Sequence, residues 1–229
     1  MPYSVKSVIF DIDNTLYDFA YYNGIALDKL REYAHENFAW TAETFDEKHL
    51  AVQHEIYSQI GYNGSCRDRM LRYQKMLEHS SLPLFPHAAK MFELYWSTML
   101  ENLQPYNGVR EVLEALKERE LIIGIGSDMT PYIQVKKLEK MNVLQFIDFI
   151  VTSEEAGDEK PSPKVFQMCL DKAGCSKSEC LFVGDDLKKD YEGAGNFGMR
   201  ALLMNPHNKE LSNDIQQITS LTQILEMIN

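Results

Sequence analysis

Five short stretches of apolar, β-branched-rich residues recur along the chain, and each is followed by a polar or small residue and then a helical pattern. They are VKSVIFD (5–11), LIIGIGSD (121–128), FIDFIVTS (146–153), CLFVGDD (180–186) and RALLMN (200–205). Stretches that are apolar on both faces are typical of strands covered on both sides. Their alternation with helices predicts an α/β fold, with a Rossmann-like, doubly wound parallel sheet.

The helical segments carry their own start and stop signals. In NGVREVLEALKERE, apolar residues recur at helical spacing and form one stripe opposite the charges. This stripe consists of Val109, Val112, Leu113 and Leu116. Thr130-Pro131 and Ser162-Pro163 are typical of an N-cap followed by proline at the first helical position, and Gly174 suits a helix end. Because helices begin directly after the strands, we expect the polar strand-end residues along one edge of the sheet, where open α/β folds bind ligands.

The segment from 19 to 104 breaks this alternation. It contains no convincing strand, but several helical stretches rich in Tyr, Leu, Met and His. Because it follows the first strand directly and precedes the second, it indicates an inserted α-helical cap domain over 19–104. The Rossmann-like core would then consist of 1–18 and 105–229. In the alternative interpretation, these helices simply enlarge the core.

Composition narrows the possible partners. Charged residues make up 25% of the chain and the formal net charge is −11. We therefore expect neither nucleic acid nor an anionic membrane as a partner, because both need a basic face. No signal peptide or membrane span is visible, so the expected location is cytoplasmic. Cys66, Cys169, Cys175 and Cys180 form no CxxC pair, which favours reduced, structural thiols, and the sequence does not indicate an oligomeric state.

Two aspartates end the first apolar stretch, in VIFDIDNT (8–15). An extended strand would place Asp11 and Asp13 on the same side of the chain, with side chains about 6–7 Å apart. Such a pair is solvated, protonated at one member, or bridged by a cation. An EF-hand calcium loop does not fit, because Leu16 and Tyr22 stand where that loop needs Gly and Glu. Since VIF argues against a solvated turn at Asp11, the pattern favours a divalent cation with oxygen ligands.

Two further strand ends supply polar side chains for the same edge. VGDDLKKD contributes Asp185, Asp186 and Asp190, and LIIGIGSD contributes Ser127 and Asp128. Taken alone, GDD is also common in plain turns. Its position after a buried strand favours a role beside the first acidic pair.

An acidic metal site needs hydrogen-bond donors before it can hold an anionic substrate. The Ser127 hydroxyl and the backbone N–H groups at the start of the next helix are candidates. Lys160, in GDEKPSP, lies just before a helix that begins with proline. By itself Lys160 also fits a solvated surface charge, but its place on this edge favours a role in the site.

In this order, these residues resemble the four motifs of the haloacid dehalogenase-like (HAD) hydrolase superfamily. The motifs are DxDxT (Asp11, Asp13, Thr15), a strand-end serine (Ser127), Lys-Pro (Lys160, Pro161) and GDxxxxD (Gly184, Asp185, Asp190). The resemblance extends over 5–18 and 106–204. EKPSPKVF and VGDDLKKDYEGAGNFGM are especially similar to the subgroup with a helical cap inserted after the first motif.

The resemblance implies a phosphatase that forms an aspartyl-phosphate intermediate. Asp11 would be the nucleophile that attacks phosphorus, and Asp13 the general acid and base. Mg²⁺ would be held by the Asp11 carboxylate, the Asp13 backbone carbonyl and Asp185. Ser127 and Lys160 would bind the phosphoryl oxygens.

Supporting roles follow for the other motif residues. Asp128 and Thr15 are further candidates for substrate binding, Thr15 by bracing the first loop. Asp190 would orient the motif lysine or a metal-bound water, and Asp186 is a rival metal ligand. Met129 departs from the pattern, because many relatives have glycine there, which eases a positive φ.

The leading hypothesis is therefore a Mg²⁺-dependent phosphatase that acts on a small phosphorylated metabolite. A phosphosugar mutase of the same fold and a non-catalytic phosphometabolite-binding protein stay open. Asp13 argues against a dehalogenase, which lacks the second aspartate. Within the expected cap, Arg67, Arg69 and Arg72 are candidates for contact with a second anionic group, although arginines more often lie on solvated faces.

Overall fold

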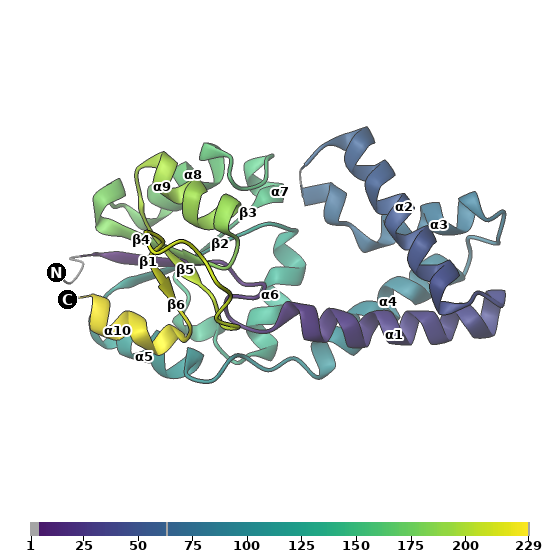
Figure 1. Ribbon diagram of the computed structural model, residues 1–229, viewed down its shortest axis with the longest axis horizontal. Helices are drawn as coiled ribbons and strands as arrows, with labels where there is room; N and C mark the ends of the chain where they lie inside the picture. The colour runs from purple at the N-terminus through teal and green to yellow at the C-terminus, as the bar shows by residue number, and fades with distance from the viewer. Residues whose placement is uncertain (1–4, 63, 229) are drawn as a thin grey trace. The chain divides into compact units, whose positions relative to one another are not determined.

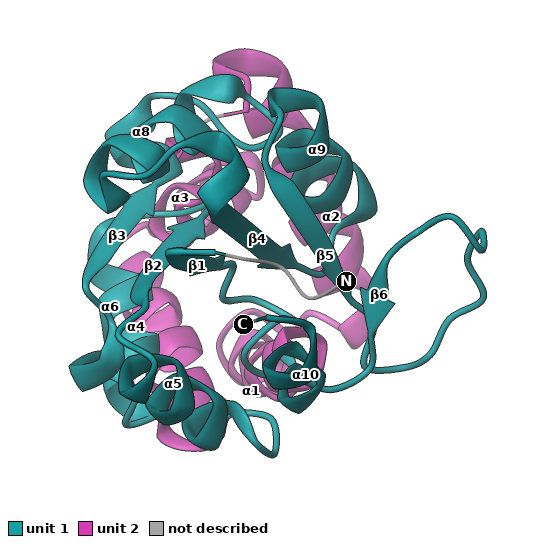
Figure 2. Cartoon of the chain, turned by 90° about the vertical axis from the view of Figure 1, so that its left-hand side faces the viewer, with its two compact units in different colours: residues 1–18, 104–229 teal, residues 19–103 magenta. Residues whose placement is uncertain are grey.

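The chain divides into two compact units. The computed structural model describes residues 5–62 and 64–228. Unit 1 contains residues 1–18 and 104–229, and unit 2 contains residues 19–103 (Figure 2). Unit 2 is thus inserted between Asp18 and Gln104, and both of these residues belong to unit 1.

Unit 1 is built on one six-stranded parallel sheet with the order β3-β2-β1-β4-β5-β6. The strands are β1 (Ser7–Phe10), β2 (Ile122–Ser127), β3 (Phe149–Thr152), β4 (Cys180–Gly184), β5 (Arg200–Met204) and β6 (Gln217–Ile218). Strand order reverses about β1, as in doubly wound sheets. The predicted α/β, Rossmann-like fold is confirmed.

Helices cover both faces of this sheet. Helices α8 and α9 lie on one face, and α5 and α10 lie on the other (Figures 1 and 2). The α-helices of unit 1 are α5 (Val109–Glu118), α6 (Pro131–Lys140), α7 (Ser153–Ala156), α8 (Pro163–Ala173), α9 (Gly193–Phe197) and α10 (Ile224–Met227). Short 3₁₀ helices η2 (Leu144–Phe146), η3 (Lys177–Glu179) and η5 (Leu221–Gln223), and the π-helix η4 (Leu187–Glu192), complete the unit.

Helices are the regular elements found in the described residues of unit 2, 19–62 and 64–103. Its elements are α1 (Phe19–Phe38), α2 (Ala42–Ile60), η1 (Gly64–Arg67), α3 (Arg69–His79) and α4 (His87–Glu101). Helix α4 packs on α1 and α3, and α3 also packs on α2. Among the described residues of the whole chain, no helix combines the length and hydropathy needed to cross a membrane.

The local sequence signals account for several element ends in unit 1. The four apolar residues of the predicted stripe are all fully buried in α5. Thr130 and Ser162 are the N-caps of α6 and α8, and the Ser162 hydroxyl accepts a hydrogen bond from the Lys164 N–H. Gly174 ends α8 with φ +62°, a conformation that favours glycine. Strand β6 was not predicted, because its two residues are too few to form an alternating pattern.

Strand register brings three of the predicted site segments together. Phe10 of β1 pairs with Ile125 of β2 on one side and with Val183 of β4 on the other. The carboxyl ends of these three adjacent strands therefore lie side by side. Asp11 follows β1 and Asp185 follows β4, so the order of the sheet alone places both acids at the same edge.

Candidate active site

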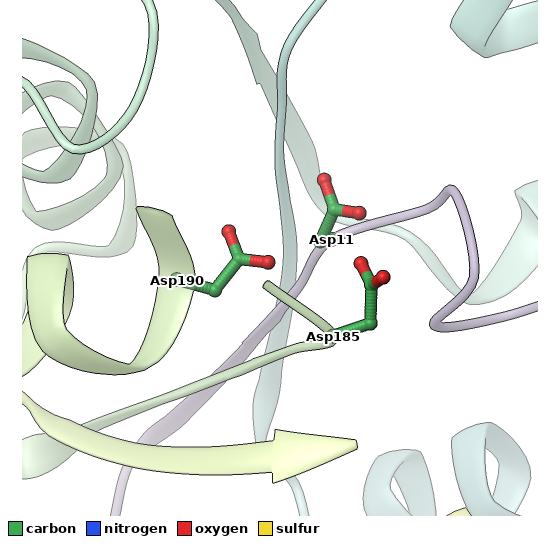
Figure 3. Close-up of side chains that lie close together, drawn as sticks. All are labelled: Asp11, Asp185 and Asp190. Atoms are coloured by element: carbon green, nitrogen blue, oxygen red, sulfur yellow. The ribbon is translucent and has the colours of Figure 1, made fainter. Parts of the chain in front are cut away.

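Three carboxylates from two strand ends and one helix meet at this edge. Carboxylate oxygens of Asp11, Asp185 and Asp190 lie within 4.8 Å of one another (Figure 3). Asp190 comes from η4, directly after the β4 strand end. Gly184 makes room for it, because a Cβ there would lie 2.3 Å from Asp190 Oδ2. The fourth motif therefore has glycine at this position because a larger side chain would clash with Asp190.

Lys160 is the cation that contacts this cluster. Its Nζ lies 2.7 Å from Asp11 Oδ1 and 2.7 Å from Asp190 Oδ1, and it donates to the Gly126 carbonyl at 2.9 Å. Only 3% of Lys160 is exposed, so the alternative of a solvated surface charge is wrong. One lysine beside three carboxylates leaves an excess of negative charge.

Burial makes this excess costly, as the pKa values of the acids show. Burial raises the pKa of Asp11 to about 7, although Lys160 opposes the shift. Burial and the Asp11 charge raise the pKa of Asp185 to about 8, and burial also raises the pKa of Asp190. The cluster must therefore take up protons or bind a cation. Three carboxylate oxygens at this spacing fit a hard divalent cation such as Mg²⁺, which prefers oxygen ligands.

Ser127 and its support complete the surroundings of the Asp11 carboxylate. The Ser127 hydroxyl donates to Asp11 Oδ1 at 2.9 Å. Gln134 of α6 donates from Nε2 to Ser127 Oγ at 2.7 Å and to the Asp128 carbonyl at 3.1 Å. Gln134 is fully buried, so these hydrogen bonds are shielded from water and fix the serine. The sequence interpretation did not include Gln134.

Asp13 pairs with a buried lysine that sequence reasoning also missed. Lys137 Nζ lies 2.6 Å from Asp13 Oδ1 and 2.9 Å from Oδ2, and the Tyr17 hydroxyl donates to Oδ1 at 2.5 Å. Lys137 is fully buried, whereas 26% of the Asp13 side chain is exposed. A signal was available: Ile133, Lys137 and Leu138 share one face of α6 at helical spacing, and a lysine on an apolar face needs a partner.

Asp128 supports the loop that carries Lys160. Its Oδ1 accepts a hydrogen bond from the Lys160 backbone N–H at 3.0 Å, and its Oδ2 lies 2.7 Å from Lys189 Nζ. Lys189 also pairs with Glu159 at 2.8 Å. These contacts occupy the Asp128 carboxylate, which moreover would repel an anionic substrate. Asp128 therefore lies at the sheet edge, but its carboxylate positions the loop of Lys160 and is not a free group for binding substrate.

Asp186 and Thr15 contribute differently from the other motif residues. The Asp186 Oδ1 caps η4 by accepting hydrogen bonds from the Lys188 and Lys189 N–H groups, at 2.9 and 3.0 Å. Asp185, and not Asp186, joins the three-carboxylate cluster. Thr15 is fully buried, and its hydroxyl has no hydrogen-bond partner in the described part of the chain.

Met129 adopts the conformation for which glycine is the usual residue. Its φ is +133°, and its N–H donates to the Ser153 hydroxyl at 2.8 Å. A side chain at positive φ is strained, so this buried hydrogen bond helps to hold the turn after β2 in place. The motif departure therefore changes the side chain at this turn and preserves the positive φ.

Comparison with known proteins agrees with these motifs. The family model of the haloacid dehalogenase-like hydrolases matches residues 8–204. The chain is 33% identical over 205 residues to a ribulose-1,5-bisphosphate 5-phosphatase of Halopiger xanaduensis, covering 87% of this chain and 84% of that protein. It is 29% identical over 234 residues to a glyceraldehyde 3-phosphate phosphatase of Methanothermobacter thermautotrophicus, covering 98% and 100%.

A solved structure shows the same fold. The HAD-hydrolase YfnB of Bacillus subtilis, described as bound to magnesium, superposes with a TM-score of 0.74 at 20% identity, and 98% of each chain is covered. The family match spans most of the chain and includes residues 8–10 of the first strand, the inserted unit 2 and the fourth motif. This chain belongs to the haloacid dehalogenase-like hydrolase family.

Proposed function

We propose that this hydrolase is a Mg²⁺-dependent phosphatase that cleaves a small phosphomonoester through an aspartyl-phosphate on Asp11. One observation carries the proposal: Asp11 Oδ1 accepts hydrogen bonds from both Ser127 and Lys160, beside Asp185 and Asp190. Phosphoryl transfer depends on positioning and charge neutralisation. The two hydrogen-bond donors can position a phosphoryl group beside Asp11. Lys160 and a cation bound by the carboxylate oxygens can neutralise its charge.

Mg²⁺ is the proposed cofactor, with Asp11, Asp185 and the Asp13 backbone carbonyl as its ligands. When bound, the ion offsets the negative charge of the carboxylates and of the phosphate group. Asp190 would keep Lys160 in place through their 2.7 Å ion pair.

In the first step, an Asp11 carboxylate oxygen forms a bond to phosphorus while the ester P–O bond breaks. Ser127 and Lys160 donate hydrogen bonds to the phosphoryl oxygens. These hydrogen bonds stabilise the negative charge on those oxygens in the transition state. Asp13 gives its proton to the leaving oxygen and becomes a carboxylate. The buried Lys137 stabilises that carboxylate, because its Nζ lies 2.6 Å from Asp13 Oδ1.

In the second step, Asp13 removes a proton from a water molecule whose oxygen bonds to phosphorus. The bond between phosphorus and Asp11 breaks, inorganic phosphate leaves, and both aspartates return to their starting states. Lys137 and Tyr17 hold Asp13 in one orientation for both proton transfers.

Small phosphorylated metabolites are the proposed substrates. The two relatives named above are phosphatases of ribulose 1,5-bisphosphate and glyceraldehyde 3-phosphate, which supports this class without selecting a member. Unit 2 is the proposed cap that selects among them. The four cysteines are free thiols, which supports the cytoplasm as the proposed location.

Phosphate release from a panel of phosphomonoesters, including p-nitrophenyl phosphate, tests the proposal in Mg²⁺ and in EDTA. We expect turnover in Mg²⁺, none in EDTA, and a loss of about 10⁴-fold or more in Asp11→Asn, because the nucleophile is removed. Asp171→Asn is the matched control, because Asp171 is an exposed residue of α8. Interconversion of sugar phosphates without stoichiometric phosphate release would instead identify a mutase.

A further inference from the structure

Unit 2 contains two arginines on α3 that have no carboxylate partner among the described residues. Arg72 is 2% exposed, and the half-buried Arg69 precedes it by one helical turn. Among the described residues, neither arginine forms an ion pair. The Nε atoms of both arginines are buried and have no hydrogen-bond partner within residues 5–62 and 64–228. Two positive charges and two N–H donors are thus left uncompensated.

The contacts that the guanidinium groups do make are with neutral groups. Arg69 donates to the Arg67 carbonyl at 3.3 Å and to the Tyr95 hydroxyl at 3.4 Å, both long hydrogen bonds. Arg69 Cζ also lies 5.1 Å from the centroid of the Tyr95 ring. Arg72 Nη1 donates to His49 Nε2 at 3.2 Å. None of these groups carries negative charge.

The neighbouring titratable groups do not supply an anion either. Burial, together with the charges of Arg72 and Arg69, lowers the pKa of His49 to about 3, which keeps the imidazole neutral. Burial raises the pKa of Tyr73, so its hydroxyl stays protonated, and this buried hydroxyl has no hydrogen-bond partner among the described residues. Asp68, the acid next to α3, accepts a hydrogen bond from the Met70 N–H at 2.7 Å as the N-cap.

Another arginine of unit 2 shows the arrangement that the pair lacks. Arg31 of α1 pairs with Asp28 at 2.6 Å and with Asp46 at 2.9 Å, on the protein surface. The buried Arg72 needs such a partner more, because burial of an unpaired charge costs several kcal/mol. Guanidinium groups match the oxygens of phosphate in both charge and geometry.

We propose that Arg69, Arg72 and the Tyr73 hydroxyl form an oxyanion-binding site within unit 2, and that its ligand is a phosphate group. Two positive charges favour a dianion over a single carboxylate. The free N–H groups of the arginines and the tyrosine O–H would donate to its oxygens. All three residues lie on α3 of unit 2, whereas the proposed catalytic residues all belong to unit 1.

Calorimetric titration of the full chain with inorganic phosphate in EDTA tests this site. EDTA removes metal from the acidic cluster of unit 1, whose negative charge then disfavours phosphate. We expect binding by the wild type, and a dissociation constant at least tenfold higher for Arg69→Gln and for Arg72→Gln. Arg31→Gln is the control and should change binding less than twofold. Absence of binding by the wild type, or equal binding by all four proteins, overturns the proposal.

Thermal unfolding distinguishes a ligand site from a purely structural role. Without phosphate, Arg72→Gln should unfold at the wild-type temperature or above it, because an uncompensated buried charge is removed. Phosphate should raise the unfolding temperature of the wild type and leave that of Arg72→Gln unchanged. If Arg72→Gln does not fold, the arginines are structural unless Arg69→Gln folds and loses phosphate binding.

A second titration identifies the source of the phosphate group. Glycerol 2-phosphate replaces inorganic phosphate under the same conditions. Tighter binding of the ester assigns the site to a phosphorylated metabolite, and tighter binding of inorganic phosphate assigns it to the free ion. Either result supports the proposal only if the Arg72→Gln variant binds the same ligand more weakly than the wild type does.

Discussion

Two buried charge clusters in this protein have opposite imbalances. In unit 1, three carboxylates cluster at the edge of the sheet, and one lysine contacts two of them, those of Asp11 and Asp190. In unit 2, two arginines on α3 contact a neutral histidine, a tyrosine and a backbone carbonyl, and no carboxylate among the described residues. The first cluster lacks positive charge and the second lacks negative charge.

Two other lysines of unit 1 show why this difference is informative. The buried Lys137 pairs with Asp13, and the half-buried Lys189 pairs with Asp128 and Glu159. The fold therefore supplies counter-charges where it buries a lysine. A buried cluster without them is expected to need a ligand of the opposite charge: a divalent cation in unit 1 and, by our inference, a phosphate group in unit 2.

Removing Lys160 should have the largest effect on stability, because it makes the imbalance in unit 1 worse. We expect Lys160→Met to lower the free energy of unfolding by about 3–5 kcal/mol in EDTA, as for other broken buried ion pairs. We also expect kcat to fall about 10²–10³-fold. Urea unfolding and phosphate release measure the two effects. Lys164→Met, whose side chain is 63% exposed, is the control and should change neither. Wild-type stability of Lys160→Met would show that the cluster is not charged as described.

Mg²⁺ should correct the same imbalance. At a concentration about one hundred times its dissociation constant, Mg²⁺ should stabilise the wild type by about 2.7 kcal/mol relative to EDTA. Asp185→Asn should lose most of this gain, because it removes a proposed ligand. Asp186→Asn is the matched control on the adjacent residue, whose carboxylate caps η4, so it should keep the response to Mg²⁺. Equal responses of the two variants would contradict the assignment of Asp185.

A smaller effect of pH should report on the cluster in unit 2. The pKa of His49 in the folded protein, about 3, lies below its ordinary value of about 6.5, so the unfolded chain binds the extra proton between these values. His49 therefore contributes stability that is complete above about pH 6.5 and declines as the pH falls toward 3. Between pH 7 and pH 5 the loss should be about 2 kcal/mol.

His49→Gln isolates this contribution, because glutamine is neutral and can still accept a hydrogen bond from Arg72. The variant should lose less stability than the wild type over the same pH interval, as measured by urea unfolding. His54→Gln, on the same helix, is the control. Identical pH profiles for the wild type and His49→Gln would show that burial and the neighbouring arginines do not hold His49 neutral.

The fold and the residues at the sheet edge were accessible from sequence for a physical reason. In a parallel sheet, the carboxyl ends of all strands lie at the same edge. Asp11, Ser127 and Asp185 could therefore be assigned to this edge from the sequence alone. Proline and glycine signals likewise fixed the ends of α8, because their effects on φ are local.

Partners that depend on tertiary packing were not accessible in the same way. A sequence shows that Lys137 and Gln134 share a face of α6, but not that this face meets Asp13 and Ser127. It also shows Arg72 without showing whether a carboxylate faces it. That question depends on which side chains α2 and α4 bring to α3, and only the structure answers it.

The most direct test of the proposed chemistry is the trapping of a phosphorylated Asp11. In Asp13→Asn, p-nitrophenyl phosphate should still react in the first step, because p-nitrophenolate leaves without a proton. The second step should stall, because it needs Asp13 as a base. We predict a burst of about one equivalent of p-nitrophenolate and a phosphoryl group on the peptide that contains Asp11, detected by mass spectrometry. Steady turnover of the variant without a burst, and with Asp11 unmodified, would contradict an aspartyl-phosphate mechanism.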